Sequence, residues 1–198
     1  MRTVVASFAA LALVVPAGAL AQPVSTMGGV GPDTYLEVHA GAFVPHSKDL
    51  DRLDPNLAFG GTFGARFNPN VSAELEIAYA RASGTGTDWK SAFDEIPVTA
   101  SLRLRYPMKV AELSAFAGGG VHFAHLWVES GGGTVTALDH SSHDTVFGYH
   151  IGAEAAFNLS PTMRVGFEVR ETFATAKFDG VSTDIGGLRL AATAGWHF

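Results

Sequence analysis

The sequence contains no cysteine, which excludes a disulfide-stapled scaffold, a thiolate metal centre, a cysteine nucleophile and a lipid-anchored N-terminal cysteine. Charged residues are also scarce, at 16% of 198 residues, whereas an average soluble domain has about 25%. Beyond the N-terminus, no stretch approaches the ~18 consecutive apolar residues of a membrane-spanning helix. The low charge favours a membrane protein, and the lack of apolar runs excludes a bundle of membrane helices.

The N-terminus has the parts of a secretory signal peptide in their usual order. Arg2 precedes an apolar stretch at residues 4–15, which is too short to span a bilayer. The small residues at positions 19–21, Ala-Leu-Ala, then match a cleavage site. We therefore expect residues 1–21 to be removed on export. The mean hydropathy of +0.19 for the whole chain comes almost entirely from this segment, so the remaining residues average near zero.

The rest of the chain shows period-two alternation of apolar and polar residues, which is the signal of half-buried β-strands. Eight such segments occur, at residues 36–44, 59–67, 73–79, 98–106, 113–127, 147–157, 165–173 and 188–198. His125 and Glu171 break the phase near strand ends. The connections alternate between short turns and longer polar loops, the latter at about residues 45–57, 81–95, 129–144 and 175–185. This rhythm predicts an all-β, eight-stranded, antiparallel up-and-down barrel.

The polar face of these segments indicates which way the barrel faces. Its basic residues are six arginines, whereas all four lysines fall in expected loops or turns, at Lys48, Lys90, Lys109 and Lys177. A solvated face has no reason to avoid lysine, but a confined interior favours the planar guanidinium that pairs with carboxylates. The pattern therefore favours a transmembrane barrel with a polar lumen over a soluble barrel with an apolar one.

Aromatic residues on the apolar face gather at two levels, as they do at the two interfaces of a membrane. One group is Phe67, Tyr106, Phe157, Trp196 and Phe198, and the other is Phe59, Tyr79, Trp127, Phe147 and Tyr149. The chain ends at Phe198 on an amphipathic strand, the feature that the outer-membrane assembly machinery of Gram-negative bacteria reads. We expect Leu190, Trp196 and Phe198 to form this assembly signal.

Two stretches carry a family resemblance. Residues 61–76 (GTFGARFNPNVSAELE) and 114–120 (SAFAGGG) resemble the OmpA-like outer-membrane β-barrel domain family. The resemblance extends over about residues 33–198 and rests on composition rather than on invariant motifs. It implies a small eight-stranded barrel in the outer membrane.

The lumen of eight strands has room for little more than side chains. Because buried charges must be paired, we expect the inward-facing ionisable residues to form a salt-bridged plug. These residues are Glu37, Arg66, Glu74, Glu76, Arg103, Arg105, Glu154, Arg164, Glu168, Arg170 and Arg189.

Other functions have weaker support. A narrow small-solute conduit is the first alternative, and a lipid A-modifying enzyme is the second. The enzyme would need a Ser/His/acid set, for which the candidates are His122, His125, Ser130, His140, Ser141, Ser142 and His143. His140 and His143 are also weak candidates for a loop metal site, but nothing fixes a ligand geometry, and a solvated loop is the favoured explanation. No nucleotide motif or basic patch suggests nucleic acid.

We therefore interpret the chain as a monomeric outer-membrane barrel at residues 35–198, preceded by a periplasmic tail at residues 22–34. The expected role is structural or surface interaction: membrane integrity, adhesion or lipopolysaccharide contact through the long extracellular loops. No cofactor and no catalytic residue are expected. The expected partners are outer-membrane lipids, lipopolysaccharide and the assembly machinery.

Overall fold

The computed structural model describes residues 33–46, 50, 53–85, 89–130 and 138–198. The expected signal peptide and most of the expected tail lie outside these residues. The described residues form ten strands: β1 (Asp33–Pro45), β2 (Asp54–Asn68), β3 (Val71–Thr85), β4 (Trp89–Pro107), β5 (Ala111–Ser130), β6 (Leu138–Asn158), β7 (Met163–Phe173), β8 (Thr175–Phe178), β9 (Val181–Asp184) and β10 (Gly187–His197). Within the described residues, no helix is long and apolar enough to cross a membrane.

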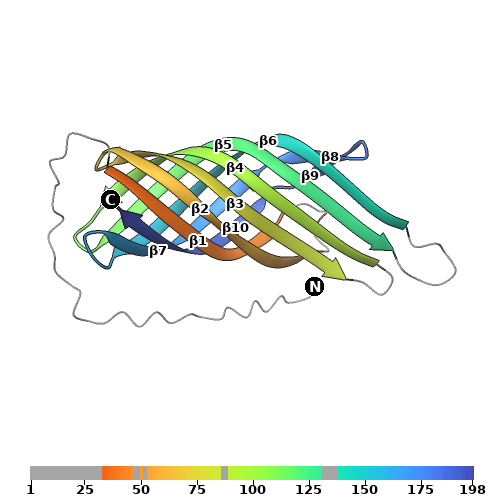
Figure 1. Cartoon of the computed structure of the whole chain (residues 1–198), viewed down its shortest axis with the longest axis horizontal. Coiled ribbons are helices and arrows are strands. Elements are labelled where there is room, and N and C mark those ends of the chain that lie inside the picture. The colour runs from red at the N-terminus through yellow and green to blue at the C-terminus, as the bar shows by residue number, and fades with distance from the viewer. Residues whose placement is uncertain (1–32, 47–49, 51–52, 86–88, 131–137) are drawn as a thin grey trace.

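Eight of the strands close into an antiparallel barrel in the ring order β1-β10-β7-β6-β5-β4-β3-β2 (Figure 1). The ring closes where β1 pairs with β10, from Tyr35 opposite His197 to Pro45 opposite Gly187. Every neighbouring pair is antiparallel, so the predicted up-and-down barrel is confirmed.

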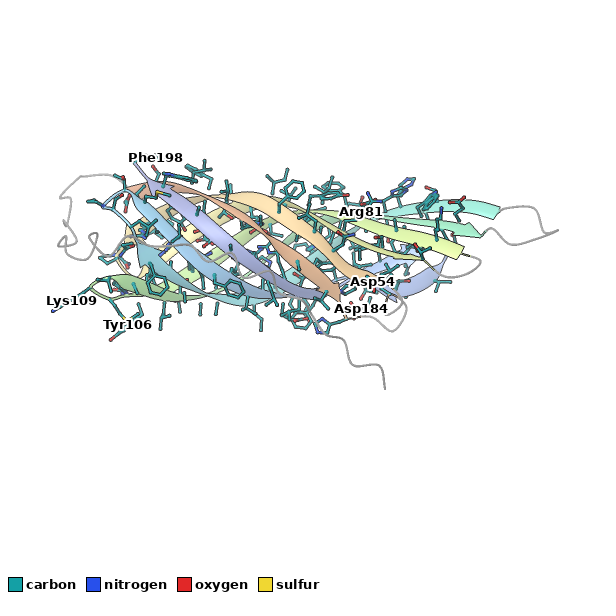
Figure 2. All side chains as sticks on the ribbon, turned by 90° about the horizontal axis from the view of Figure 1, so that it is seen from below. Asp54, Arg81, Tyr106, Lys109, Asp184 and Phe198 are labelled. Carbon is teal, nitrogen blue, oxygen red and sulfur yellow. The ribbon has the colours of Figure 1, made fainter. Side chains whose placement is uncertain are left out.

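The two ends of the barrel differ. The end with the short connections β2–β3, β4–β5 and β6–β7 also holds the C-terminus, and we call it the turn end; the opposite end is the loop end. Figure 2 shows Tyr106, Lys109 and Phe198 at the turn end and Arg81 towards the loop end. Among the strands of the barrel, β3 to β6 extend farthest towards the loop end (Figure 1).

The barrel is inside-out compared with a soluble domain. Large apolar side chains stand on the outer surface, where Leu75 is 63% exposed and Leu104 is 63% exposed, while arginines and glutamates are buried. The outward aromatic residues include contacting pairs at the loop end: Phe59 lies 5.4 Å from Tyr79, and Tyr149 stacks on Phe173 at 5.0 Å between ring centroids. A surface of this kind is stable only against lipid.

The strands are longer than the alternation predicted. Most of the expected loops at residues 81–95 and 129–144 are strand, because β3 to β6 continue beyond the aromatic residues of the loop end. Consequently Lys90 lies in β4 and not in a loop. The expected loop at residues 175–185 contains the separate hairpin β8–β9, which holds Lys177 and turns at Asp179 and Gly180, both with positive φ. His125 and Glu171 point outward, as their phase indicated.

Two lumen glycines make room for aromatic rings that lie inside the barrel. Tyr35 is paired with Gly64 across β1 and β2, and a Cβ on Gly64 would lie 2.1 Å from the Tyr35 ring. Phe116 is paired with Gly152 across β5 and β6 in the same way, at 2.3 Å. Each ring occupies the space that a side chain at the paired glycine would need, because the lumen is too narrow for both.

We expect Gly64→Val to destabilise the barrel by about 1–3 kcal/mol, because the added side chain overlaps the Tyr35 ring. Urea unfolding of the protein in lipid vesicles measures this change. Gly61→Val is the matched control, since a Cβ on Gly61 would have Glu37 O, at 3.7 Å, as its neighbour. Equal stabilities for the two variants would contradict the packing argument.

Candidate functional site

The inward-facing side chains of the barrel form a continuous network of charges. Ten of the eleven expected network residues are buried, and Arg66 at the turn end is partly exposed. The structure brings all eleven into ion pairs with one another or with a further glutamate, Glu112. The eleven expected residues lie on seven of the eight barrel strands, and Glu112 lies on the eighth, β5. Every strand of the barrel therefore contributes to one cluster.

Glu76 on β3 is held by two arginines from the far side of the lumen. Arg170 on β7 donates to both carboxylate oxygens at 2.6 Å, and Arg189 on β10 donates to the same oxygens at 3.0 Å. Strands β3 and β7 stand opposite each other in the ring. Bidentate charge-assisted bonds of this kind are strong and directional, and here they cross the full width of the lumen.

Arg103 on β4 lies at the centre of the network. Its Nε is 2.5 Å from Glu74, its Nη1 donates to Glu154, and its Nη2 is 3.8 Å from both Glu37 and Glu168. The guanidinium also lies over the Phe116 ring, 4.6 Å from its centroid. Because these carboxylates belong to four different strands, one side chain links much of the barrel wall.

The same network continues to the turn end of the lumen. Arg164 donates to Glu112 at 2.8 Å and to Glu37 at 2.5 Å, and Arg105 bonds to Glu112 as well. The guanidinium of Arg105 lies 4.7 Å from the centroid of the Tyr35 ring. The sequence interpretation missed Glu112 because it precedes the expected strand start by one residue, although its phase was inward.

Histidines line the lumen on the loop side of the charges. His122 bonds to Glu95, and His150 Nε2 lies 2.7 Å from the hydroxyl of Ser101. His122, His150 and Glu95 line a cavity of about 20 Å³ together with Glu76, Arg170 and Phe43. Glu95 was assigned to a loop in the sequence, so the interpretation missed it. With Glu95 and Glu112 added to the five expected glutamates, seven glutamates face six arginines.

An apolar cluster fills the loop end of the lumen, where the sequence predicted a polar interior. Phe43 and Phe93 from the wall pack with Leu50, with Phe178 of the β8–β9 hairpin and with Ile185. All five are buried. We call this cluster the apolar cap. The lumen thus contains paired charges towards the turn end and packed apolar side chains at the loop end.

One carboxylate outside the membrane-spanning part fastens the hairpin to the wall. Asp144 on the extension of β6 accepts hydrogen bonds from the backbone N–H groups of Lys177, at 2.6 Å, and Thr145, at 2.8 Å. These bonds lower the pKa of the Asp144 carboxyl below its ordinary value. The charged form that they stabilise holds β8 beside β6.

The remaining expected residues lie on the outer surface or outside the described part. Leu190 and Trp196 point outward on β10, and Phe198 is exposed, with its backbone N–H bonded to Thr34 O at 3.0 Å. The His140 side chain lies outside the described residues, and His143 is exposed. Within the described residues, no group of three or more His, Asp or Glu side chains is arranged to hold a metal ion.

The candidates for an enzyme site are divided between two faces. His122 lies inside the lumen, whereas His125 Nε2 lies 2.8 Å from the Ser141 hydroxyl on the outer surface. Among the described ion pairs, no carboxylate contacts His125. The Ser–His contact therefore has no acid partner in the part of the chain that the structure describes.

The sequence matches the family of the outer membrane protein beta-barrel domain over residues 7–198. Among solved structures, neisserial surface protein A is 15% identical, with 83% of this chain and 97% of that chain covered and a TM-score of 0.56. OprG from Pseudomonas aeruginosa is also 15% identical, with coverages of 85% and 96% and a TM-score of 0.54. A major outer membrane protein from Thermus thermophilus is 14% identical, with coverages of 84% and 99% and a TM-score of 0.54. No curated protein is a significant match. At these identities the similarity shows the fold.

We expect Arg103→Gln to lower the free energy of unfolding by about 3–5 kcal/mol, because it leaves several buried carboxylates without their shared cation. Equilibrium unfolding in vesicles, with the gel mobility of unheated samples as a check on folding, measures the loss. Arg81→Gln removes an exposed arginine and is expected to cost at most about 1 kcal/mol. Similar losses in the two variants would show that Arg103 is not the centre of the network.

Proposed function

The chain belongs to the outer membrane protein β-barrel domain family, and on this basis we propose that it is a sealed barrel that acts at the cell surface. In this proposal the barrel anchors the protein in the outer membrane and the lumen carries no solute. The turn end faces the periplasm, and the loop end, with its extended strands, faces outward. The role is structural or adhesive, with contact to lipopolysaccharide at the outer leaflet.

The observation that carries this proposal is the pairing of Glu76 with Arg170 and Arg189 across the lumen. A solute path along the axis would have to separate these charges, and an unpaired buried charge costs several kcal/mol. The apolar cap adds a second obstacle of different chemistry. Together they favour a plug over the narrow conduit that the sequence left as an alternative.

The extensions of β3 to β6 beyond the membrane-spanning part support the proposal that the protein acts at the cell surface. These strands continue well past the outward aromatic residues Phe59 and Tyr149 and carry polar residues on their outer face. A barrel that only filled the membrane would need no such extension, since about 9–11 residues per strand span a bilayer. β5 and β6 have 20 and 21 residues.

Conductance across a planar bilayer tests the seal. We expect the purified protein to give only rare, small current events, because both closures persist in the folded barrel. A variant of the cap, Phe93→Ala, should leave conductance low, because the charge network still closes the lumen. Steady openings of the unaltered protein would contradict the proposal and support the conduit.

The C-terminal strand is expected to direct assembly. Deletion of Phe198 should lower the amount of folded protein in the outer membrane, because the exposed terminal aromatic is the proposed signal. Fractionation followed by gel mobility of unheated samples measures the folded fraction. Phe198→Tyr keeps the aromatic ring and should assemble normally. Unchanged levels after deletion would refute this role.

A further inference from the structure

Strand register aligns four ionisable residues on the outer face of the barrel. Arg81 pairs with Asp94, Asp94 pairs with His125, and His125 pairs with His143, on the neighbouring strands β3, β4, β5 and β6. Residues directly opposite each other in an antiparallel sheet share a face and have Cβ atoms about 4.5–5.5 Å apart. We call these four residues the headgroup row. All of them fell in expected loops or at a strand end, so nothing in the sequence indicated that they are neighbours.

The position of the row along the barrel places it at the membrane surface. One step towards the turn end on the same face lie Ile96 and Phe123, which pair with each other and are 43% and 49% exposed. One step towards the loop end, Trp127 lies on the same strand face as His125. Tryptophan is typical of the membrane–water interface, and each step is about 6.6 Å along the strand. The row therefore lies between the hydrocarbon-facing surface and an interfacial aromatic residue, at the depth of lipid headgroups.

The row has more hydrogen-bond donors than it uses internally. The Asp94 carboxylate accepts a hydrogen bond from Tyr79 and lies 3.7 Å from the Arg81 Nε, so its charge is already compensated. A guanidinium has five N–H groups, and this contact engages one nitrogen of Arg81, whose side chain is 47% exposed. His125 and His143 add two exposed imidazoles to the same face. Because the Nε2 of His125 lies 2.8 Å from the Ser141 hydroxyl, a ligand would meet its other ring nitrogen, Nδ1. A guanidinium beside imidazoles suits an anionic, oxygen-rich group.

We propose that the headgroup row binds a phosphate group of a glycolipid in the outer leaflet, with Arg81, His125 and His143 as the donors. The site is continuous with the lipid-facing surface below it, so the ligand's acyl chains would lie against residues such as Phe123 while its phosphate reaches the row. This inference rests on the proposed function, because it requires the loop end to face outward. In this proposal, side chains on the strands contact the phosphate directly, without a bridging cation.

Binding of lipid A to the purified full-length protein tests the proposal. Native mass spectrometry would follow occupancy over a titration with diphosphorylated lipid A and with the same lipid after removal of both phosphates. We expect the unaltered protein to bind the phosphorylated form at least ~10-fold more tightly. The variant Arg81→Gln/His125→Gln/His143→Gln should lose this preference. Gel mobility of unheated samples confirms that each variant is folded.

The control variant Lys90→Gln/Lys177→Gln removes two positive charges from the same end of the barrel but leaves the row intact. It should bind phosphorylated lipid A like the unaltered protein. The proposal is overturned if the triple variant binds phosphorylated lipid A normally, if both lipid forms bind equally, or if the control variant loses binding to the same extent. Planar-bilayer conductance of the unaltered protein reports separately on the seal, so failure of the lipid site and failure of the sealed-barrel proposal give different results.

Discussion

The structure depends on one constraint: a ring of eight strands encloses a lumen so narrow that every charge inside it must be neutralised by another side chain. Arginine meets this demand because its fork can reach two carboxylates at once. Arg103 reaches four glutamates, and Glu76 is held by two arginines from the far wall. Glycines such as Gly64 then allow Tyr35 to stand beside these charges. The inward side chains therefore stabilise the barrel wall, because their ion pairs join strands on different sides of the lumen.

The same constraint distinguishes the lumen, which stabilises the wall, from the outer surface, on which the proposed function depends. A lumen filled with paired charges and with the apolar cap is suited to holding the wall together. In the proposed function, the outer face is then left for recognition. Strands β3 to β6 carry that face beyond the hydrocarbon layer, where Arg81, His125 and His143 gather. A rigid extension of the sheet can position such groups more precisely than a flexible loop can. In the proposed function, the plug and the surface contact thus complement each other.

The sequence predicted the barrel and most of the charge network, because alternation and the preference for arginine over lysine follow directly from lipid outside and a confined lumen inside. It did not predict the strand extensions. There the pattern reverses: Ala80, Ala82 and Phe93 face inward in the buried apolar cluster, whereas Arg81 and Asp94 face outward. The alternation of apolar outside and polar inside that marks the membrane strands therefore ends, and Glu95 was assigned to a loop. The Asp-Gly pair at residues 179–180 was an available signal for the β8–β9 hairpin. The apolar cap and the partner of each arginine depend on strand stagger around a closed ring, which one sequence does not specify.

The most direct test of the account is a double-mutant cycle between Glu76 and Arg170, which belong to opposite strands and can interact only across the lumen. Unfolding free energies in vesicles would be measured for Glu76→Gln, Arg170→Gln and the double variant. If the charges close the lumen by pairing, the coupling energy is favourable and exceeds about 1 kcal/mol. Additive losses from the two substitutions would contradict the account, because they would show that these charges do not depend on each other.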